Sequence, residues 1–353
     1  MTDGGTTQNT TSRTLGVDVG GANLKVADSA GFSASEAFPM WKERARLAAR
    51  LAVLFARAGS FDRLAVTMTG ELADCFPSKT AGVAYIVDAT LAAAAGQPTR
   101  FYSQRDGWIE GDAAKEQVLD VAAANWHATA TFASRFAARG SAATGSALFI
   151  DAGSTTIDVI PLEAGKPAGV GRTDTERLLS GELVYSGVER TPLFALDRVF
   201  RYRGRECPVA AELFATTADA YLLLGRLPED QANCDTANGK PRTRIETIRR
   251  LARTFCADEL EFQESDALDL AEQVQRRQVD LLADAVRRVT HRMNGPAETV
   301  VVAGHGSFLV RQALETLQMH DVPIVDLSET IGLEASRAGS AYALACLAEE
   351  TWL

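Results

Sequence analysis

The sequence has no apolar run that approaches the roughly 18 residues needed to cross a bilayer as a helix. Its first twelve residues are polar and lack the apolar core of a signal peptide, and we expect them to form a disordered tail. The net charge of −10 disfavours non-specific binding to nucleic acid or to an anionic membrane. These absences predict a soluble cytoplasmic protein with neither a nucleic-acid nor a membrane partner.

Metal and nucleotide motifs are also scarce. The five cysteines contain no CxxC pair, and no His/Cys spacing indicates zinc. We expect reduced thiols at all five. The dinucleotide fingerprint GxGxxG and the Walker A motif GxxxxGK[ST] are both absent, which disfavours Rossmann and P-loop folds. Any phosphate ligand must therefore be bound by another device.

What the chain does have is enough length and apolar content for two domains. It has 353 residues, of which 46% are hydrophobic and 23% charged. Apolar periodicity alternates between strand and helix, so the fold class is α/β. The expected strands include 63–68, 100–103, 299–303 and 323–327. The expected helices are 43–58, 82–95, 112–138, 209–224, 244–293 with a break near 264–266, 308–318 and 333–349.

One stretch, 149–160, predicts a strand, a tight turn and a return strand. Its turn is Gly153-Ser154-Thr155-Thr156, whose backbone N–H groups and hydroxyls suit phosphate oxygens. Asp151 and Asp158 stand on either side, and carboxylates in such positions suit a metal or a bound water.

A similar hairpin, 15–27, occurs about 133 positions earlier, and its turn contains Gly20 and Gly21. Glycine permits the positive φ angles that let N–H groups converge on an anion. Asp18 precedes this turn, and Asn23 and Lys25 follow it. The two hairpins predict two related lobes that face one phosphate-bearing ligand.

A third turn, 302–309, joins a strand to a helix through Gly304-His305-Gly306. Its glycines allow a ligand to approach the backbone, and the new helix N-terminus favours negative charge. The sequence does not decide whether His305 contacts a ligand.

Together the two hairpins and this turn resemble the actin-like fold of sugar kinases, Hsp70 and actin. The resemblance implies a two-lobed actin-like (ribonuclease H-like) fold with the ligand cleft between the lobes, and the segments 67–72 and 338–343 are similar to its connecting elements. We expect a first lobe at 13–145 and a second at 146–331, with a substrate-side insertion at about 172–293. The helix at 332–353 would pack back between the lobes.

The chain also resembles the hydantoinase A/oxoprolinase group, and within it the branch found beside tetrahydromethanopterin-linked one-carbon transfer. This resemblance spans nearly the whole chain and rests on segments 16–25, 66–74, 125–128, 149–158, 180–192, 215–224 and 304–309. It implies a methanofuran-synthase type of transferase. Such an enzyme displaces diphosphate from an aminomethylfuranylmethyl diphosphate with the phenol oxygen of γ-glutamyl-tyramine.

The residues are compatible with this chemistry, because loss of diphosphate needs stabilised negative charge. Asp18 and Asp151 are the candidate Mg²⁺ positions, with Asp158 behind them. The candidate phosphate contacts are Gly20, Gly21, Asn23, Lys25, Gly153, Ser154, Thr155, Thr156, Gly304 and Gly306.

A phenol nucleophile also needs a base or a cation that favours its anion. The candidates are Glu71, Glu182, His127 and Glu189, and the sequence does not rank them. The segment 182–191 has little periodicity and follows a phosphate turn, so Tyr185, Glu189 and Arg190 are candidate substrate contacts together with His127 and His305.

Two other functions stay open at this point. One is an ATP-dependent kinase or an oxoprolinase-like amidohydrolase, which the adenosine-type turn at 304–306 would serve; the sequence leaves ATP binding undecided because His305 interrupts that turn. The other is a non-catalytic, regulatory actin-like module. The expected ligands are small molecules, and a homodimer is left open.

Overall fold

The computed structural model describes residues 12–137 and 145–352. The predicted tail therefore lies outside the described residues except for Ser12. Contacts divide the chain into two compact units. Unit 1 lies within Met1–Arg135, Arg172–Asp174 and Ser328–Leu353, and unit 2 within Phe136–Gly171 and Thr175–Leu327.

Unit 1 is built on a sheet in the order β3-β2-β1-β4-β5-β6. Its strands are β1 Thr14–Val19, β2 Asn23–Ala27, β3 Ser33–Ala37, β4 Arg63–Met68, β5 Thr99–Ser103 and β6 Gly107–Ile109. Neighbours in β3-β2-β1 are antiparallel, and neighbours in β1-β4-β5 are parallel. The predicted hairpin and the two predicted strands that follow it are confirmed.

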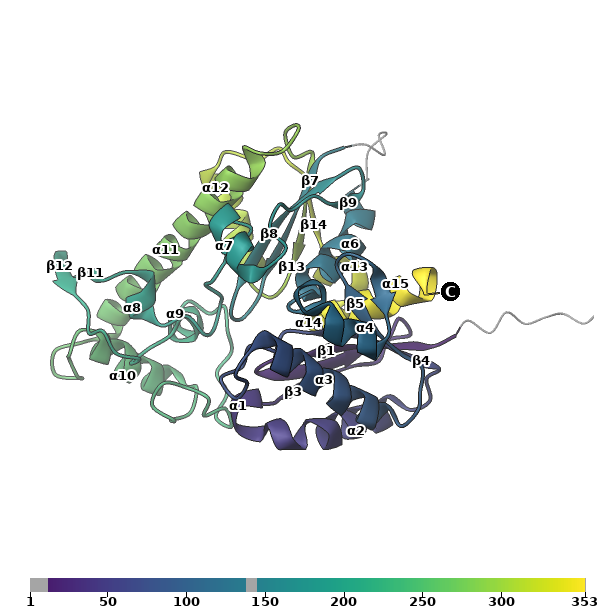
Figure 1. The fold of residues 1–353 in the computed structure, drawn as a ribbon. Helices are drawn as coiled ribbons and strands as arrows, with labels where there is room; N and C mark the ends of the chain where they lie inside the picture. Colours follow the sequence, from purple (N-terminus) through teal and green to yellow (C-terminus); the bar gives the residue numbers. More distant parts are fainter. Residues whose placement is uncertain (1–11, 138–144, 353) are drawn as a thin grey trace, which may run out of the picture. The chain divides into compact units, whose positions relative to one another are not determined.

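Alternation along β1 assigns its two faces, because successive side chains of a strand point to opposite sides. Leu15, Val17 and Val19 join a core with α2 and α3. Gly16 and Asp18 face the other way, toward α15. Figure 1 shows α2 and α3 on one side of this sheet and α15 on the other.

The helix bounds of unit 1 differ from prediction: the helix expected over 43–58 begins only at Leu47, and the helix expected over 82–95 begins earlier, at Lys79. They are α1 Met40–Glu43, α2 Leu47–Ala58, α3 Lys79–Ala94, α4 Gly111–Glu116, α5 Val118–Val121, α6 Asn125–Ala137, α13 Leu327–Ile331 (which begins in unit 2), α14 Leu333–Arg337 and α15 Gly339–Thr351. The single helix expected over 112–138 is wrong, and its last residue lies outside the described part. Ala122 instead bridges to Met68, and Ala123 has a φ of 49°. Tertiary pairing thus overrides alanine's helix propensity.

Gly16 permits α15 to approach the sheet, and we expect Gly16→Ala to destabilise the protein by about 3 kcal/mol. A Cβ at this position would overlap the backbone carbonyl of Ala341 and lie 3.0 Å from the backbone nitrogen of Ala345. Chemical denaturation measures the effect. Gly339→Ala is the matched control, because nothing lies within 4 Å of its added Cβ. Equal stability of the two variants would contradict the prediction.

Unit 2 repeats the plan of unit 1, with a sheet in the order β10-β8-β7-β13-β14 and β9 paired to β8. Its strands are β7 Ala147–Ala152, β8 Ile157–Glu163, β9 Lys166–Pro167, β10 Leu183–Val184, β11 Val199–Tyr202, β12 Arg205–Pro208, β13 Thr299–Ala303 and β14 Ile324–Asp326. The pair β7-β8 is antiparallel and the pairs β7-β13 and β13-β14 are parallel. An antiparallel hairpin followed by parallel strands, present in both units, confirms the predicted α/β, actin-like fold class.

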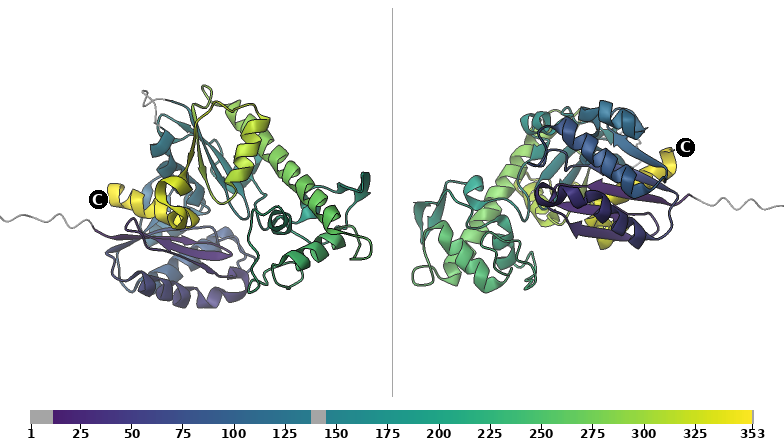
Figure 2. Two further views of the ribbon diagram at one scale, coloured as in Figure 1. Left: turned by 180° about the vertical axis from the view of Figure 1, so that it is seen from behind. Right: turned by 60° about the horizontal axis from the view of Figure 1, so that its bottom comes forward.

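A long insertion separates β10 from β13 in unit 2. The helices of this unit are α7 Asp174–Ser180, α8 Leu193–Leu196, α9 Thr217–Leu223, α10 Arg244–Thr254, α11 Glu264–Thr290 and α12 Ser307–Thr316. The C-terminal half of α11 packs into the core of the sheet, and its N-terminal half packs into a second core with α9 and α10. Both views in Figure 2 show α11 as one continuous helix that links these parts.

Two helix boundaries in the insertion differ from prediction. The helix expected over 209–224 begins only at Thr217, because Thr216 and Asp219 form a capping box there. The expected break near 264–266 lies earlier, between Thr254 and Glu264. In the described part of the chain, no helix combines the length and apolarity required to cross a membrane.

Candidate functional site

The first hairpin turn is held tightly in unit 1. The Gly20 N–H donates to the Asn23 carbonyl at 3.0 Å, and a Cβ on Gly20 would lie 2.5 Å from that oxygen. The N–H groups of Thr69 and Gly70 both donate to the Val19 carbonyl at 3.0 Å. The chain that leaves β4 therefore packs directly against this turn.

Asp18 lies beside this turn with one unsatisfied carboxylate oxygen. The Ser340 hydroxyl at the start of α15 donates to Oδ2 at 2.5 Å, while Oδ1 is buried and has no partner among the described residues. Strand register places Lys25 on one side of Asp18 and Thr67 on the other. The Thr67 hydroxyl is likewise buried without a partner. Such groups are rare in native proteins, so two side by side indicate a ligand position.

Glu71 is the other unusual acid of unit 1. Its side chain is only 2% exposed, and burial raises its pKa from 4.5 to about 7. Its Oε2 is buried with no partner in the described part of the chain. The preceding residue, Gly70, packs against Gly20, since a Cβ on Gly70 would lie 3.0 Å from the Gly20 carbonyl. Glu71 is therefore a buried carboxyl group next to the first turn, with a pKa near neutral pH.

His127 has the environment of a structural histidine. Its Nδ1 lies 2.9 Å from the Tyr102 hydroxyl, and burial lowers its pKa to about 4. A base with so low a pKa accepts a proton weakly near neutral pH. We therefore assign His127 a packing role on α6.

Glu182 is fully buried in unit 2 and has all the donors it needs. Its carboxylate accepts hydrogen bonds from the N–H groups of Val170 and Gly171 at 2.9 and 3.0 Å, and it pairs with Arg292 at 3.2 Å. Three donors on one carboxylate fix the backbone at Val170 and Gly171. This arrangement suits an anchor better than a proton acceptor.

The second hairpin turn, Gly153–Thr156, is closed by a bond from the Gly153 N–H to the Thr156 carbonyl at 2.9 Å. The segment 187–190 lies against it. The N–H groups of Glu189 and Arg190 both donate to the Ser154 carbonyl at 3.0 Å. A Cβ on Gly187 would overlap the Thr155 nitrogen, so only glycine fits there. The sequence predicted the turn, and the structure adds the segment that supports it.

A buried polar network behind this segment was not predicted. Gln278 of α11 donates to the Ser186 hydroxyl at 2.6 Å and to the Gly187 carbonyl at 2.9 Å, and it accepts from the Tyr221 hydroxyl at 2.5 Å. The Thr217 hydroxyl donates to the same Gly187 carbonyl at 2.8 Å. The available signal was a glutamine at a core position of an otherwise apolar helix face.

The two acids of the second hairpin lie opposite each other in the β7-β8 register, Asp151 against Asp158. Asp158 forms an ion pair with Arg177, whose side chain is buried. That pairing competes with metal ligation by Asp158. Within residues 12–137 and 145–352, no three His, Cys, Asp or Glu side chains gather as a metal group. Mg²⁺ binding therefore stays a prediction.

The Gly304-His305-Gly306 turn packs onto the end of β7. Gly304 has a φ of 79°, and a Cβ there would overlap the Ala152 carbonyl and lie 2.6 Å from Asp151 Oδ1. The Gly306 N–H donates to the Ala152 carbonyl at 3.0 Å. Both glycines are thus required for this turn to lie against Ala152, and Gly304 also brings it beside Asp151.

Glu189 connects three segments of unit 2. Its carboxylate lies 3.2 Å from His305 Nε2 and 2.9 Å from Arg242 Nη2, and these partners lower its pKa. Arg242, which was not predicted, comes from the 228–243 loop and has a buried Nε without a partner in the described structure. Glu189 is therefore an anionic anchor. Tyr185, 66% exposed, and the exposed Arg190 lie on the same segment and are available to a ligand.

Each unit thus presents one hairpin turn with an aspartate on the preceding strand. Residues 62–344 match the hydantoinase/oxoprolinase family. A protein of Methanocaldococcus jannaschii called (4-{4-[2-(gamma-L-glutamylamino)ethyl]phenoxymethyl}furan-2-yl)methanamine synthase is 32% identical over 339 residues, covering 95% of this chain and 97% of the relative. A Methanococcus vannielii protein of the same name is 30% identical over 201 residues, covering 57% of this chain and 89% of that protein.

Among solved structures, the fold is similar to one described as the PilM-PilN type IV pilus biogenesis complex. The TM-score is 0.52 with 13% sequence identity, and the match covers 96% of this chain and 98% of that chain. At this identity the similarity concerns the fold alone. It agrees with the repeated sheet plan of the two units.

Proposed function

We propose that this chain, which belongs to the hydantoinase/oxoprolinase family, is a transferase of methanofuran-type cofactor synthesis. The sequence-predicted relationship to the methanofuran-synthase branch is confirmed by the two named relatives. Their name describes a furan methanamine joined through an oxymethylene group to the phenyl ring of a γ-glutamylaminoethyl compound. The observation that supports the proposal is the 32% identity over 95% of this chain and 97% of the relative.

The reaction forms one bond and breaks one. The phenol oxygen of γ-glutamyl-tyramine attacks the methylene carbon of the furan diphosphate, and the carbon–oxygen bond to diphosphate breaks. Diphosphate leaves with the electron pair, and the phenol proton passes to a base. The N–H groups and hydroxyls of turns such as Gly153–Thr156 can stabilise the leaving charge.

Asp18 fits a role in holding Mg²⁺. Its unsatisfied Oδ1 and the neighbouring Thr67 hydroxyl are the hard oxygen donors that Mg²⁺ prefers. When bound, Mg²⁺ would neutralise charge on the leaving diphosphate. Lys25, opposite Asp18 in the strand register, supplies a further positive charge to the same face of the sheet.

Glu71 is the base that the geometry favours among the predicted candidates. Glu182 and Glu189 are committed to arginine and backbone partners, and His127 has its pKa lowered to about 4. Only Glu71 combines an unsatisfied buried oxygen with a pKa of about 7. A base with a pKa near the working pH can take the phenol proton efficiently.

The test is incubation of the purified protein with the aminomethylfuranylmethyl diphosphate, γ-glutamyl-tyramine and Mg²⁺. We expect release of diphosphate and formation of the ether product, both dependent on the two substrates together and independent of ATP. Chelation of Mg²⁺ is expected to abolish turnover. Turnover only with ATP would favour the kinase or amidohydrolase alternative, and no diphosphate release under any condition would refute the transferase.

A further inference from the structure

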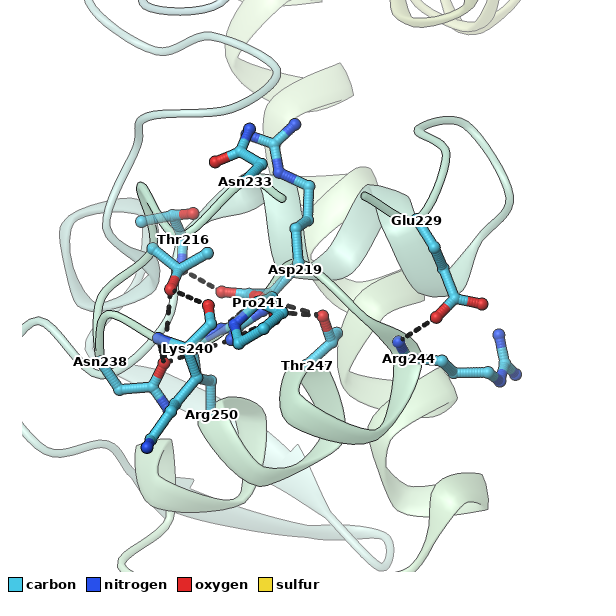
Figure 3. A network of polar contacts seen from close by, with 12 residues as sticks. Thr216, Asp219, Glu229, Asn233, Asn238, Lys240, Pro241, Arg244, Thr247 and Arg250 are labelled. Carbon is cyan, nitrogen blue, oxygen red and sulfur yellow. Dashed lines mark hydrogen bonds and ion pairs between the residues drawn. The ribbon is translucent and has the colours of Figure 1, made fainter. Parts of the chain in front are cut away.

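The insertion of unit 2 contains a cavity whose lining includes no residue of the two hairpin turns. A fully buried ion pair, Arg250 with Asp219, anchors its wall, with Arg250 Nε 2.7 Å from Asp219 Oδ1. Arg250 also reaches the oxygens of Asn238 and Pro241 at 3.3 and 3.4 Å. Figure 3 shows this cluster joining the 228–243 loop to α9 and α10. These contacts therefore fix the loop as one wall of the cavity.

The cavity has a volume of about 660 Å³, which lies in the range of small-molecule sites. Its charged lining is mixed in sign. Lys240 and Arg253 form no ion pair with any described residue, and neither does Asp258 on the same lining. Leu213, 53% exposed, and Phe214 add apolar surface. Two cations and a carboxylate that form no ion pair within the protein suit a ligand that carries both an anionic and a cationic group.

We propose that this cavity binds the zwitterionic amino-acid end of the acceptor substrate, namely the γ-glutamyl group of γ-glutamyl-tyramine; this rests on the proposed function. Lys240 and Arg253 pair with the α-carboxylate, and Asp258 pairs with the α-ammonium. Leu213 and Phe214 cover the methylene groups between them. The cavity thus selects the acceptor by the end that does not react.

The cavity is connected to the second phosphate turn within unit 2. Arg242 follows Lys240 by two residues and pairs with Glu189 at 2.9 Å. The Glu189 N–H in turn donates to the Ser154 carbonyl of the turn at 3.0 Å. One continuous set of contacts therefore links acceptor recognition to the turn that binds the leaving group.

The experiment compares three acceptors: γ-glutamyl-tyramine, glutaryl-tyramine, which lacks the ammonium, and butanoyl-tyramine, a neutral amide that lacks both charges. Each is titrated by calorimetry into the full-length protein, with diphosphate and Mg²⁺ present, and is then assayed for KM and kcat. The variants are the double variant Lys240→Ala/Arg253→Ala and the single variant Asp258→Asn. The control is Arg57→Ala, an exposed arginine of α2 in unit 1.

We expect the double variant to bind γ-glutamyl-tyramine about 10- to 100-fold more weakly, with kcat unchanged and the affinity for butanoyl-tyramine unaltered. Asp258→Asn should remove the preference for γ-glutamyl-tyramine over glutaryl-tyramine. Unchanged affinity of the double variant, an equal loss of affinity for butanoyl-tyramine, or no binding of γ-glutamyl-tyramine to the wild type would each overturn the proposal. Binding is measured apart from turnover, so a failure of the transferase reaction alone is seen separately.

Discussion

Replacement of Asp18 by asparagine is expected to lower the rate of diphosphate release about 10³-fold. The substitution keeps the shape of the side chain and removes its charge. Ser340 can still donate to the remaining oxygen, but the unsatisfied Oδ1 position becomes an uncharged NH2 group, which donates hydrogen bonds and does not bind Mg²⁺. The loss should appear in kcat/KM for the furan diphosphate, measured as diphosphate released with time.

The free energy of unfolding of the same variant should equal the wild-type value or exceed it by about 1 kcal/mol. Asp18 is only 4% exposed, and burial of a carboxylate with an unsatisfied oxygen costs more free energy than burial of an uncharged amide. Chemical denaturation distinguishes a functional loss from unfolding. Asp112→Asn, at a side chain that is 99% exposed, is the control and should change neither property. Full activity in Asp18→Asn would exclude the assigned role.

The sheets and their turns could be predicted because their signals are local. The mostly apolar run at 63–68 and the glycines at 20–21 and 153 determine strands and hairpins from neighbouring residues alone. The helix breaks could not be predicted, since they depend on distant contacts. Ala122 pairs with Met68, and nothing in an alanine-rich run indicates that bridge.

The same division applies to the candidate site. The turn glycines and hydroxyls were predicted because anion binding by a turn needs those residue types in sequence. The partner of Asp18, Ser340, lies 322 residues away, and Arg242 and Gln278 reach their turn from an insertion. The rank of Glu71 among four candidate bases followed only from burial and from the partners of the other three.

Replacement of Glu71 by glutamine should lower kcat by about 10²- to 10⁴-fold and change its pH dependence. In the wild type the rate is expected to rise with pH through about 7, because Glu71 must be deprotonated to accept the phenol proton. Glutamine cannot titrate, so the variant should lack this rise. The measurement is kcat against pH from 5.5 to 8.5, with the exposed Glu110→Gln as the control. A rise through pH 7 that persists in Glu71→Gln would assign the base elsewhere.

Stability provides an independent check on the same carboxyl. Because burial raises the pKa of Glu71 from 4.5 to about 7, the folded state binds more protons than the unfolded state between those values. Its contribution is complete below pH 4.5 and is lost as the pH rises through 7, by about 3 kcal/mol. Glutamine has no such loss, so the variant should match the wild type near pH 4.5 and exceed it near pH 8. Urea denaturation at both values tests this, and a difference between the proteins that is the same at both would show that Glu71 titrates normally. A variant that is slower yet more stable above pH 7 is the result expected of a carboxyl buried for catalysis.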